Sequence, residues 1–122
     1  MFVRTYKGVS FRGWCRPLQG SWYGERVSKI HNGHIVEVGV YRGLSLSYIF
    51  EACEANGNII YAVDAWETIA GEENRQEFVE CRKAFEAAIE HLEFGDMVKT
   101  LPMISAKAAL QFEDESIDLV YL

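Results

Sequence analysis

The segment HIVEVGVYRGLSLSYIF, residues 34–50, is the part of the sequence that most constrains the fold. Its apolar start leads into a turn bracketed by Gly39 and Gly43, and then into residues with helical spacing. A second apolar run, IIYAV at 59–63, is followed by an acid, Asp64. Strand, glycine turn, helix, strand and acid is an order typical of α/β sheets, which bind ligands at the carboxyl ends of their parallel strands.

The rest of the chain continues this alternation of strands and helices. Apolar runs and turn residues predict strands at 34–38, 59–63, 97–101 and 117–122. Helical periodicity predicts helices at 44–55, 72–92 and 107–112. Because strands that alternate with helices pair in parallel through right-handed crossovers, we expect an α/β fold. It would be the N-terminal half of a Rossmann-like doubly wound sheet, with strand order 3-2-1-4 and helices on both faces.

The N-terminal segment, residues 1–33, differs from the rest in pattern and in charge. Residues 1–20 lack clean periodicity and predict an irregular arm, followed by a short helix from Ser21, as its N-cap, to about Ile30. Residues 1–30 carry six Lys or Arg and one acid, a net +5, whereas the remainder carries six and 17, a net −11. Basic residues among aromatics can suit nucleic acid, but an arm packed on its own acidic body also explains them. The acidic body argues against a phosphate-binding surface, so nucleic acid is not an expected partner.

Composition excludes several other classes. At 122 residues and 49% hydrophobic content the chain fits one globular domain. No apolar run approaches the roughly 20 residues needed to cross a bilayer, so a membrane is not an expected partner. The three cysteines are widely spaced and form no CxxC pair, which argues against a disulfide framework or a metal site. We therefore expect no metal, and a reduced, cytoplasmic protein.

The spacing of glycines in the turn also indicates which class of nucleotide ligand the chain could bind. A dinucleotide site would show GxGxxG after the first strand, but Gly39 and Gly43 are four residues apart. No GxxxxGK[ST] motif is present, which disfavours a nucleoside triphosphate. An NAD-dependent enzyme is therefore a weaker hypothesis than one with a different nucleoside ligand.

The pattern E-V-G-V-Y-R-G-L-S at 37–45 resembles motif I of class I S-adenosylmethionine-dependent methyltransferases. Its E-x-G-x-Y-x-G-x-S form is similar to that of the catechol O-methyltransferase branch, while VDAWE and SIDLVYL resemble small bacterial and phage members. The resemblance covers residues 34–122. It implies a partial S-adenosylmethionine-binding domain there, S-adenosylmethionine as the small-molecule cofactor, and methyl transfer to an acceptor that the sequence does not identify.

The resemblance also implies roles for residues of the first turn. Glu37 would lie near the amino group of the cofactor's methionine part, and Gly39 and Gly43 would let the backbone approach the cofactor. Tyr41 and Ser45 match positions that contact the methionine part. Two alternatives remain open: Glu37 as a carboxylate satisfied by backbone N–H groups, and Ser45 as a simple helix cap.

Further positions follow the second and third strands. Asp64 would accept both ribose hydroxyls, with a loop cap as the alternative. Ala65 and Trp66 would line the adenine, although Trp66 could instead belong to the core. Ser105 and Ala106 would contact the adenine edge, and Ser105 could also be the N-cap of a helix.

In the catechol-type branch an acid that follows the fourth strand binds a divalent metal, and this sequence stops before that position, at Leu122. We therefore expect an incomplete chain with impaired or no catalysis, and we assign no catalytic residue. The apolar strand at 117–122 would lie at a sheet edge and favour self-association. The alternative is a non-catalytic binding or assembly module on the same fold.

Overall fold

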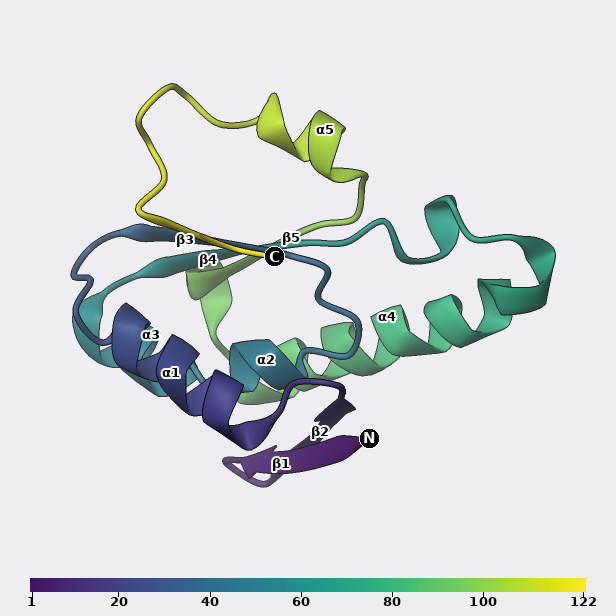
Figure 1. Ribbon diagram of the computed structural model, residues 1–122, viewed down its shortest axis with the longest axis horizontal. Coiled ribbons are helices and arrows are strands. Elements are labelled where there is room, and N and C mark those ends of the chain that lie inside the picture. Colours follow the sequence, from purple (N-terminus) through teal and green to yellow (C-terminus); the bar gives the residue numbers. More distant parts are fainter.

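Four parallel strands form the central sheet of the computed structural model, which describes all 122 residues (Figure 1). The strands are β3 (His34–Val38), β4 (Ile59–Val63), β5 (Val98–Leu101) and β6 (Leu119–Tyr121). They lie in the order β5-β4-β3-β6, with Ile35 of β3 opposite Ile60 on one side and Leu119 on the other. Counted along the parallel strands this order is 3-2-1-4, so the predicted Rossmann-like half-sheet is confirmed.

Helices cover both faces of the sheet (Figure 1). One face carries α1 (Pro17–Val27), α2 (Leu44–Ser47), α3 (Phe50–Asn56) and α4 (Glu72–Leu92), and the other carries α5 (Ser105–Ala109). Two short 3-10 turns, η1 (Trp66–Thr68) and η2 (Gly95–Met97), follow β4 and precede β5. No helix combines the length and the apolar character needed to cross a membrane.

The alternation of side chains along β3 decides which face each residue joins. Ile35 packs in the larger core, on the face of α1 to α4, and Val36 packs with Ala108 of α5 in a smaller cluster. Glu37, two residues after Ile35, therefore points into the larger helical layer, where its side chain is fully buried. This orientation places one carboxyl inside the apolar layer.

The predicted irregular arm is wrong, because residues 2–13 form an antiparallel hairpin. Its strands are β1 (Phe2–Tyr6) and β2 (Val9–Gly13), joined by a two-residue loop in which Lys7 and Gly8 have φ of 46° and 83°. Two positive φ values are typical of the tight hairpin turn that Asn-Gly or Asp-Gly usually signals. Lysine in the first position removes that signal from the sequence.

Helix α1 begins earlier than predicted. Its N-cap is Arg16 and its first residue is Pro17, so Ser21 is not the N-cap. Proline suits the first helical position because its missing N–H would have no partner there. The helix also ends at Val27 rather than Ile30.

The helix predicted at 44–55 is two helices, α2 and α3, with a tight turn at Tyr48 and Ile49. Contacts with the N-terminal segment account for the break. The guanidinium of Arg4 lies 4.5 Å from the Tyr48 ring centroid and donates to the Ser47 carbonyl at 2.7 Å. The Tyr48 ring also fills the space beside Gly20 of α1, where an added Cβ would lie 2.4 Å from it.

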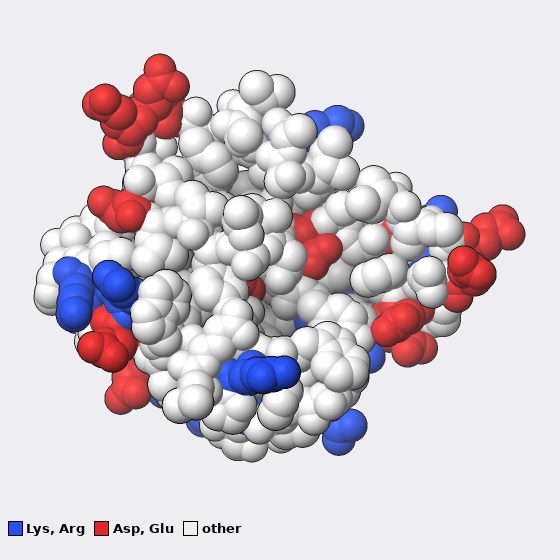
Figure 2. Space-filling model, viewed as in Figure 1, with Lys and Arg blue, Asp and Glu red and all other residues white.

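Other boundaries shift by one to three residues. β5 starts at Val98 and β6 spans only 119–121, while α5 runs from 105 to 109. The C-caps of α3 and α4 are Gly57 and Glu93, and both have left-handed dihedral angles. Figure 2 shows acidic side chains at the free end of α4 and near the loop before β6, whereas the middle of this face is mostly uncharged.

Candidate functional site

The turn after β3 is fixed by the carboxylate that ends β4. The backbone N–H of Tyr41 donates to Oδ2 of Asp64 at 2.8 Å, and the N–H of Trp66 donates to Oδ1 at 2.8 Å. Both donors have positive φ, 57° and 42°, which is uncommon for residues other than glycine. Asp64 thus makes the contacts expected of a loop cap. Each of its oxygens keeps a second lone pair for another donor.

A cavity of about 250 Å³ opens beside this carboxylate, and we call it the β5-side cavity. It lies at the carboxyl ends of β3 and β4 and under the loop that joins β5 to α5. Its lining residues are Val38, Gly39, Val63, Asp64, Ala65, Ile69, Met103, Ile104 and Ser105. A mostly apolar recess with one carboxylate suits a flat apolar group that carries a few hydroxyls.

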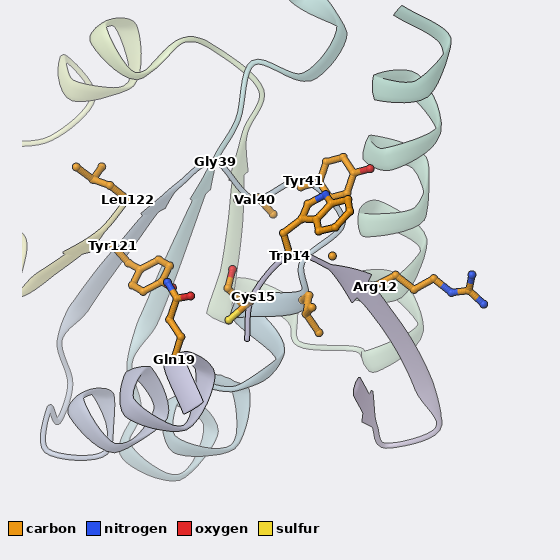
Figure 3. Close-up of a pocket in the computed structure, with 12 residues that line it drawn as sticks. Arg12, Trp14, Cys15, Gln19, Gly39, Val40, Tyr41, Tyr121 and Leu122 are labelled. Carbon is orange, nitrogen blue, oxygen red and sulfur yellow. The ribbon is translucent and has the colours of Figure 1, made fainter. Parts of the chain in front are cut away.

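A second cavity of about 250 Å³, the hairpin-side cavity, lies where the N-terminal segment meets β3, α2 and β6. It is lined by Arg12, Gly13, Trp14, Cys15, Gln19, Gly39, Val40, Tyr41, Leu44, Ser45, Tyr121 and Leu122. Figure 3 shows Trp14 and Tyr41 on one side of it and Tyr121 and Leu122 on the other, while Arg12 points away. The amide Nε2 of Gln19 donates to the Tyr121 hydroxyl at 2.6 Å and ties α1 to β6.

Gly39 lines both cavities. Its φ is 87°, and an added Cβ would meet no atom within 4 Å, so open space lies above its backbone. Gly43 has a similar φ of 92°, but a Cβ there would lie 2.7 Å from the Phe85 ring. The first glycine therefore leaves room for a ligand that runs from one cavity to the other, whereas the second allows close packing of the turn on α4.

Glu37 is buried behind this turn, with its side chain on the face of α1 and α2. The hydroxyl of Ser45 donates to Oε2 at 2.8 Å, but Oε1 has no hydrogen-bond partner. Burial raises the pKa of Glu37 to about 8, against the opposing effects of the Ser45 and Tyr23 hydroxyls. No backbone N–H contacts this carboxyl, so the alternative of a carboxylate satisfied by the main chain is wrong.

Tyr41 and Trp66 hold the turn from two sides. Tyr41 lines the hairpin-side cavity and its hydroxyl donates to Oε1 of Glu77 at 3.0 Å. The Trp66 side chain is 2% exposed, its ring lies 5.9 Å from that of Phe85, and its Nε1 donates to the Tyr41 carbonyl at 2.8 Å. The indole thus lies in the core, and Ala65 is its neighbour that lines the β5-side cavity.

The two positions predicted after β5 lie at the start of α5. Ser105 lines the β5-side cavity, whereas Ala106 is exposed and outside its lining. The N-cap of α5 is Ile104, which has extended dihedral angles, so Ser105 is not the N-cap. No group of three or more His, Cys, Asp or Glu side chains is arranged to hold a metal ion.

Sequence reasoning missed every residue that the N-terminal segment brings to this site. Trp14, Cys15 and Gln19 line the hairpin-side cavity, and Tyr23 lies next to Glu37. Their only signal is the spacing of the buried residues of α1, Gly20, Tyr23 and Val27, which marks one helical face. That spacing predicts burial, but it does not tell which strand the face covers.

With this geometry established, comparisons place the chain among known proteins. No curated protein matches the sequence. Among solved structures it is similar to the SAH-bound methyltransferase PaMTH1 of Podospora anserina, with a TM-score of 0.64 and 21% sequence identity. The match covers 88% of this chain and 40% of that one, so this chain spans less than half the length of the protein it matches. The likeness shows the Rossmann-like methyltransferase fold. The family described as "Methyltransferase domain" matches residues 36–122, which are most of the sequence, and the chain belongs to this family.

Proposed function

We propose that this chain binds S-adenosylmethionine, and its product S-adenosylhomocysteine (SAH), as the cofactor half of a methyltransferase. The observation that carries the proposal is the open space above Gly39, which adjoins two cavities of similar volume. Asp64 lines the cavity on one side, and Ser45, with Glu37 behind it, belongs to the other. A nucleoside joined to an amino acid has this distribution of polar groups.

The nucleoside would occupy the β5-side cavity. The ribose hydroxyls would donate to the free lone pairs of Asp64, whose oxygens are already oriented by two backbone N–H groups. Val38, Ile69 and Met103 would flank the adenine with apolar surface, next to Ala65. Because the indole of Trp66 is buried, only the main chain of Trp66 could contribute to this pocket.

The amino acid part would cross Gly39 into the hairpin-side cavity. There its ammonium group would face the carboxyl of Glu37, and a nearby positive charge favours the ionised form of that carboxyl. Ser45, Tyr41 and Gly43 belong to the turn that holds this end. Methyl transfer further requires an acceptor aligned behind the methyl group, and such alignment supplies much of the rate. The acceptor and the group that takes its proton are not assigned to residues of this chain.

Calorimetry with SAH tests the proposal. We expect the wild type to bind, and Asp64→Ala to weaken binding by roughly 10- to 100-fold, the effect of losing hydrogen bonds to a charged group. Asp118→Ala is the matched control, because Asp118 also accepts a backbone N–H, that of His34, but at the amino end of β3. It should lower stability without changing the affinity for SAH.

Three outcomes would contradict the proposal in different ways. Failure of the wild type to bind SAH would favour a non-catalytic binding or assembly module on this fold. Equal affinity of Asp64→Ala and wild type would remove the ribose role of Asp64. Binding of NAD in place of SAH, in the same titration, would support a dinucleotide site despite the missing GxG pair.

A further inference from the structure

Helix α1 and strand β3 bring two buried polar groups together and leave both without a partner. The hydroxyl of Tyr23 and Oε1 of Glu37 are inaccessible to solvent, and neither takes part in a hydrogen bond. Both side chains are 0% exposed, and the phenol is near enough to lower the pKa of the Glu37 carboxyl. Unpartnered buried polar atoms are rare in folded proteins because nothing replaces the water they lose. Two of them side by side indicate that a hydrogen bond forms between them when the charge of one group changes.

The chemistry of the two groups says what that change is. Burial, together with the charge of Glu37, raises the pKa of Tyr23 far above its ordinary value, so the phenol keeps its proton. A phenol that keeps its proton can donate to a carboxylate oxygen. Ser45 already donates to Oε2 of Glu37, so Oε1 is the atom that lacks a donor.

Contacts with β6 fix the position of the Tyr23 ring. The rings of Tyr23 and Tyr121 stack with centroids 4.0 Å apart and an angle of 8° between their planes. Gln19, one turn before Tyr23 on α1, donates to the Tyr121 hydroxyl at 2.6 Å. These two contacts join α1 to β6 and keep Tyr23 of α1 next to Glu37.

We infer that Tyr23 is a positioning residue of the cofactor site, whose hydroxyl donates to Oε1 of Glu37 when Glu37 ionises to hold the ammonium group of the cofactor. The inference rests on the proposed function. Ser45 and Tyr23 then each donate to one carboxylate oxygen, and each oxygen keeps a lone pair that can accept from the ammonium group of the ligand. Tyr23 lies outside residues 36–122, the part that matches the methyltransferase family, so the N-terminal segment supplies a part of the cofactor site.

Other ionisable groups around Glu37 come from three neighbouring elements. The charge of Asp64, at the end of β4, raises the pKa of Glu37. Burial raises the pKa values of Cys15, before α1, and Tyr121, in β6, and the nearby charge of Glu37 adds to both shifts. No lysine or arginine is among the groups that shift the pKa of Glu37. The two hydroxyls are therefore the groups of the protein that favour its ionised form.

The test is the pH dependence of SAH affinity, measured by calorimetry from pH 6 to pH 9.5 in wild type and Tyr23→Phe. Loss of one hydrogen-bond donor raises the pKa of Glu37 further, so the ionised fraction at pH 7 falls by about tenfold. The affinity of Tyr23→Phe should therefore be about tenfold lower than that of wild type at pH 7 and within about twofold at pH 9.5. The amino group of SAH titrates in the same range, but it affects both proteins equally and cancels in the ratio.

Val27→Ala is the control for a purely structural role, because Val27 is a fully buried residue of the same helix that carries no polar group. Any loss of affinity in this variant should be the same at every pH. The inference would be overturned if Tyr23→Phe lost the same SAH affinity at every pH, or lost none at pH 7. SAH binding by the wild type would stand in either case. If Tyr23→Phe does not fold, NMR of the wild type decides: the Tyr23 hydroxyl proton should become slowly exchanging when SAH is added, and its absence would overturn the inference. Failure of wild type to bind SAH would instead overturn the proposed function.

Discussion

At the scale of single residues, Glu37 couples the protonation of the site to the stability of the fold. Burial raises its pKa from 4.5 to about 8, so between these pH values the folded chain holds a proton that the unfolded chain releases. The stability that this group contributes is fully present below about pH 4.5 and is lost as the pH rises through 8. Without ligand, this carboxyl therefore makes the folded chain less stable in mildly alkaline solution than in mildly acidic solution.

Glu37→Gln isolates this effect, because an amide of the same shape does not titrate. We expect the two proteins to have similar free energies of unfolding near pH 5. Near pH 8.5 the variant should be more stable by roughly 3–5 kcal/mol, the value of a shift of this size. Urea unfolding without ligand measures the difference, and parallel stability curves across this range would contradict the prediction.

Gly39 and Gly43 form a matched pair at the same scale, since their φ values differ by only a few degrees but their surroundings differ. Alanine at either position costs roughly 1–2 kcal/mol of backbone strain. Gly43→Ala also forces a Cβ against the Phe85 ring at 2.7 Å, which adds roughly 1–3 kcal/mol of overpacking. Gly39→Ala places its Cβ in open space that the ligand would need.

We therefore expect opposite rankings in two measurements. In urea unfolding, Gly43→Ala should be the less stable variant. In calorimetry with SAH, Gly39→Ala should lose at least tenfold in affinity and Gly43→Ala less. Equal loss of affinity in both variants would mean that the space above Gly39 is not where the ligand crosses.

At the scale of elements, α1 packs closely against the turn between α2 and α3 because two of its residues, Gly20 and Gly24, have no side chain. A Cβ on Gly24 would lie 2.7 Å from the carbonyl oxygen of Tyr48, which belongs to the main chain and cannot rotate away. Helix propensity alone predicts that Gly24→Ala stabilises α1 by about 1 kcal/mol. The steric contact predicts a net destabilisation of roughly 1–2 kcal/mol, because the helix must move.

Ser21→Ala is the control for this prediction, since Ser21 is exposed on the same helix. It should be neutral or slightly stabilising in urea unfolding, as its helix propensity suggests. If Gly24→Ala is as stable as Ser21→Ala, the close approach of α1 to Tyr48 does not constrain the fold.

The same elements show what the sequence could and could not reveal. β3, β4 and α4 have the predicted boundaries, because long apolar runs and clear helical periodicity are local properties. The hairpin and the break at Tyr48 were missed, because they depend on a lysine in a positive-φ turn and on tertiary contacts with Arg4 and Gly20. For the same reason the motif residues of the turn could be named from the sequence, but Tyr23 could not.

At the scale of the whole molecule, the charge difference between the N-terminal segment and the rest is only partly neutralised by contact. One ion pair, Lys7 to Glu54 at 2.7 Å, joins the hairpin to α3, and Arg4 binds a main-chain carbonyl instead of an acid. Acidic side chains remain at the free end of α4 and near the loop before β6, away from the mostly uncharged middle of the face in Figure 2. The N-terminal segment packs on the rest of the chain mainly through buried aromatic residues such as Tyr6 and Phe11.

β6 forms one edge of the central sheet. It pairs with β3 on one side, its other edge carries no strand, and Val120 is 55% exposed. An edge strand with free backbone groups and apolar side chains favours pairing with another chain. We therefore expect a mass above that of the monomer, rising with protein concentration, in light scattering at about 0.15 M salt, where repulsion between distant charges is largely screened.

Val120→Lys should shift this equilibrium toward the monomer, because a charged side chain on an edge strand opposes pairing. Leu110→Lys is the matched control: Leu110 is 84% exposed but lies at the end of α5, so it adds the same charge outside the strand. A monomeric mass at every concentration, or equal dissociation by the two variants, would show that β6 is not the contact. Dissociation by Val120→Lys alone would instead place the contact at the strand whose Tyr121 also stacks on Tyr23, so self-association and cofactor affinity would then have to be measured together.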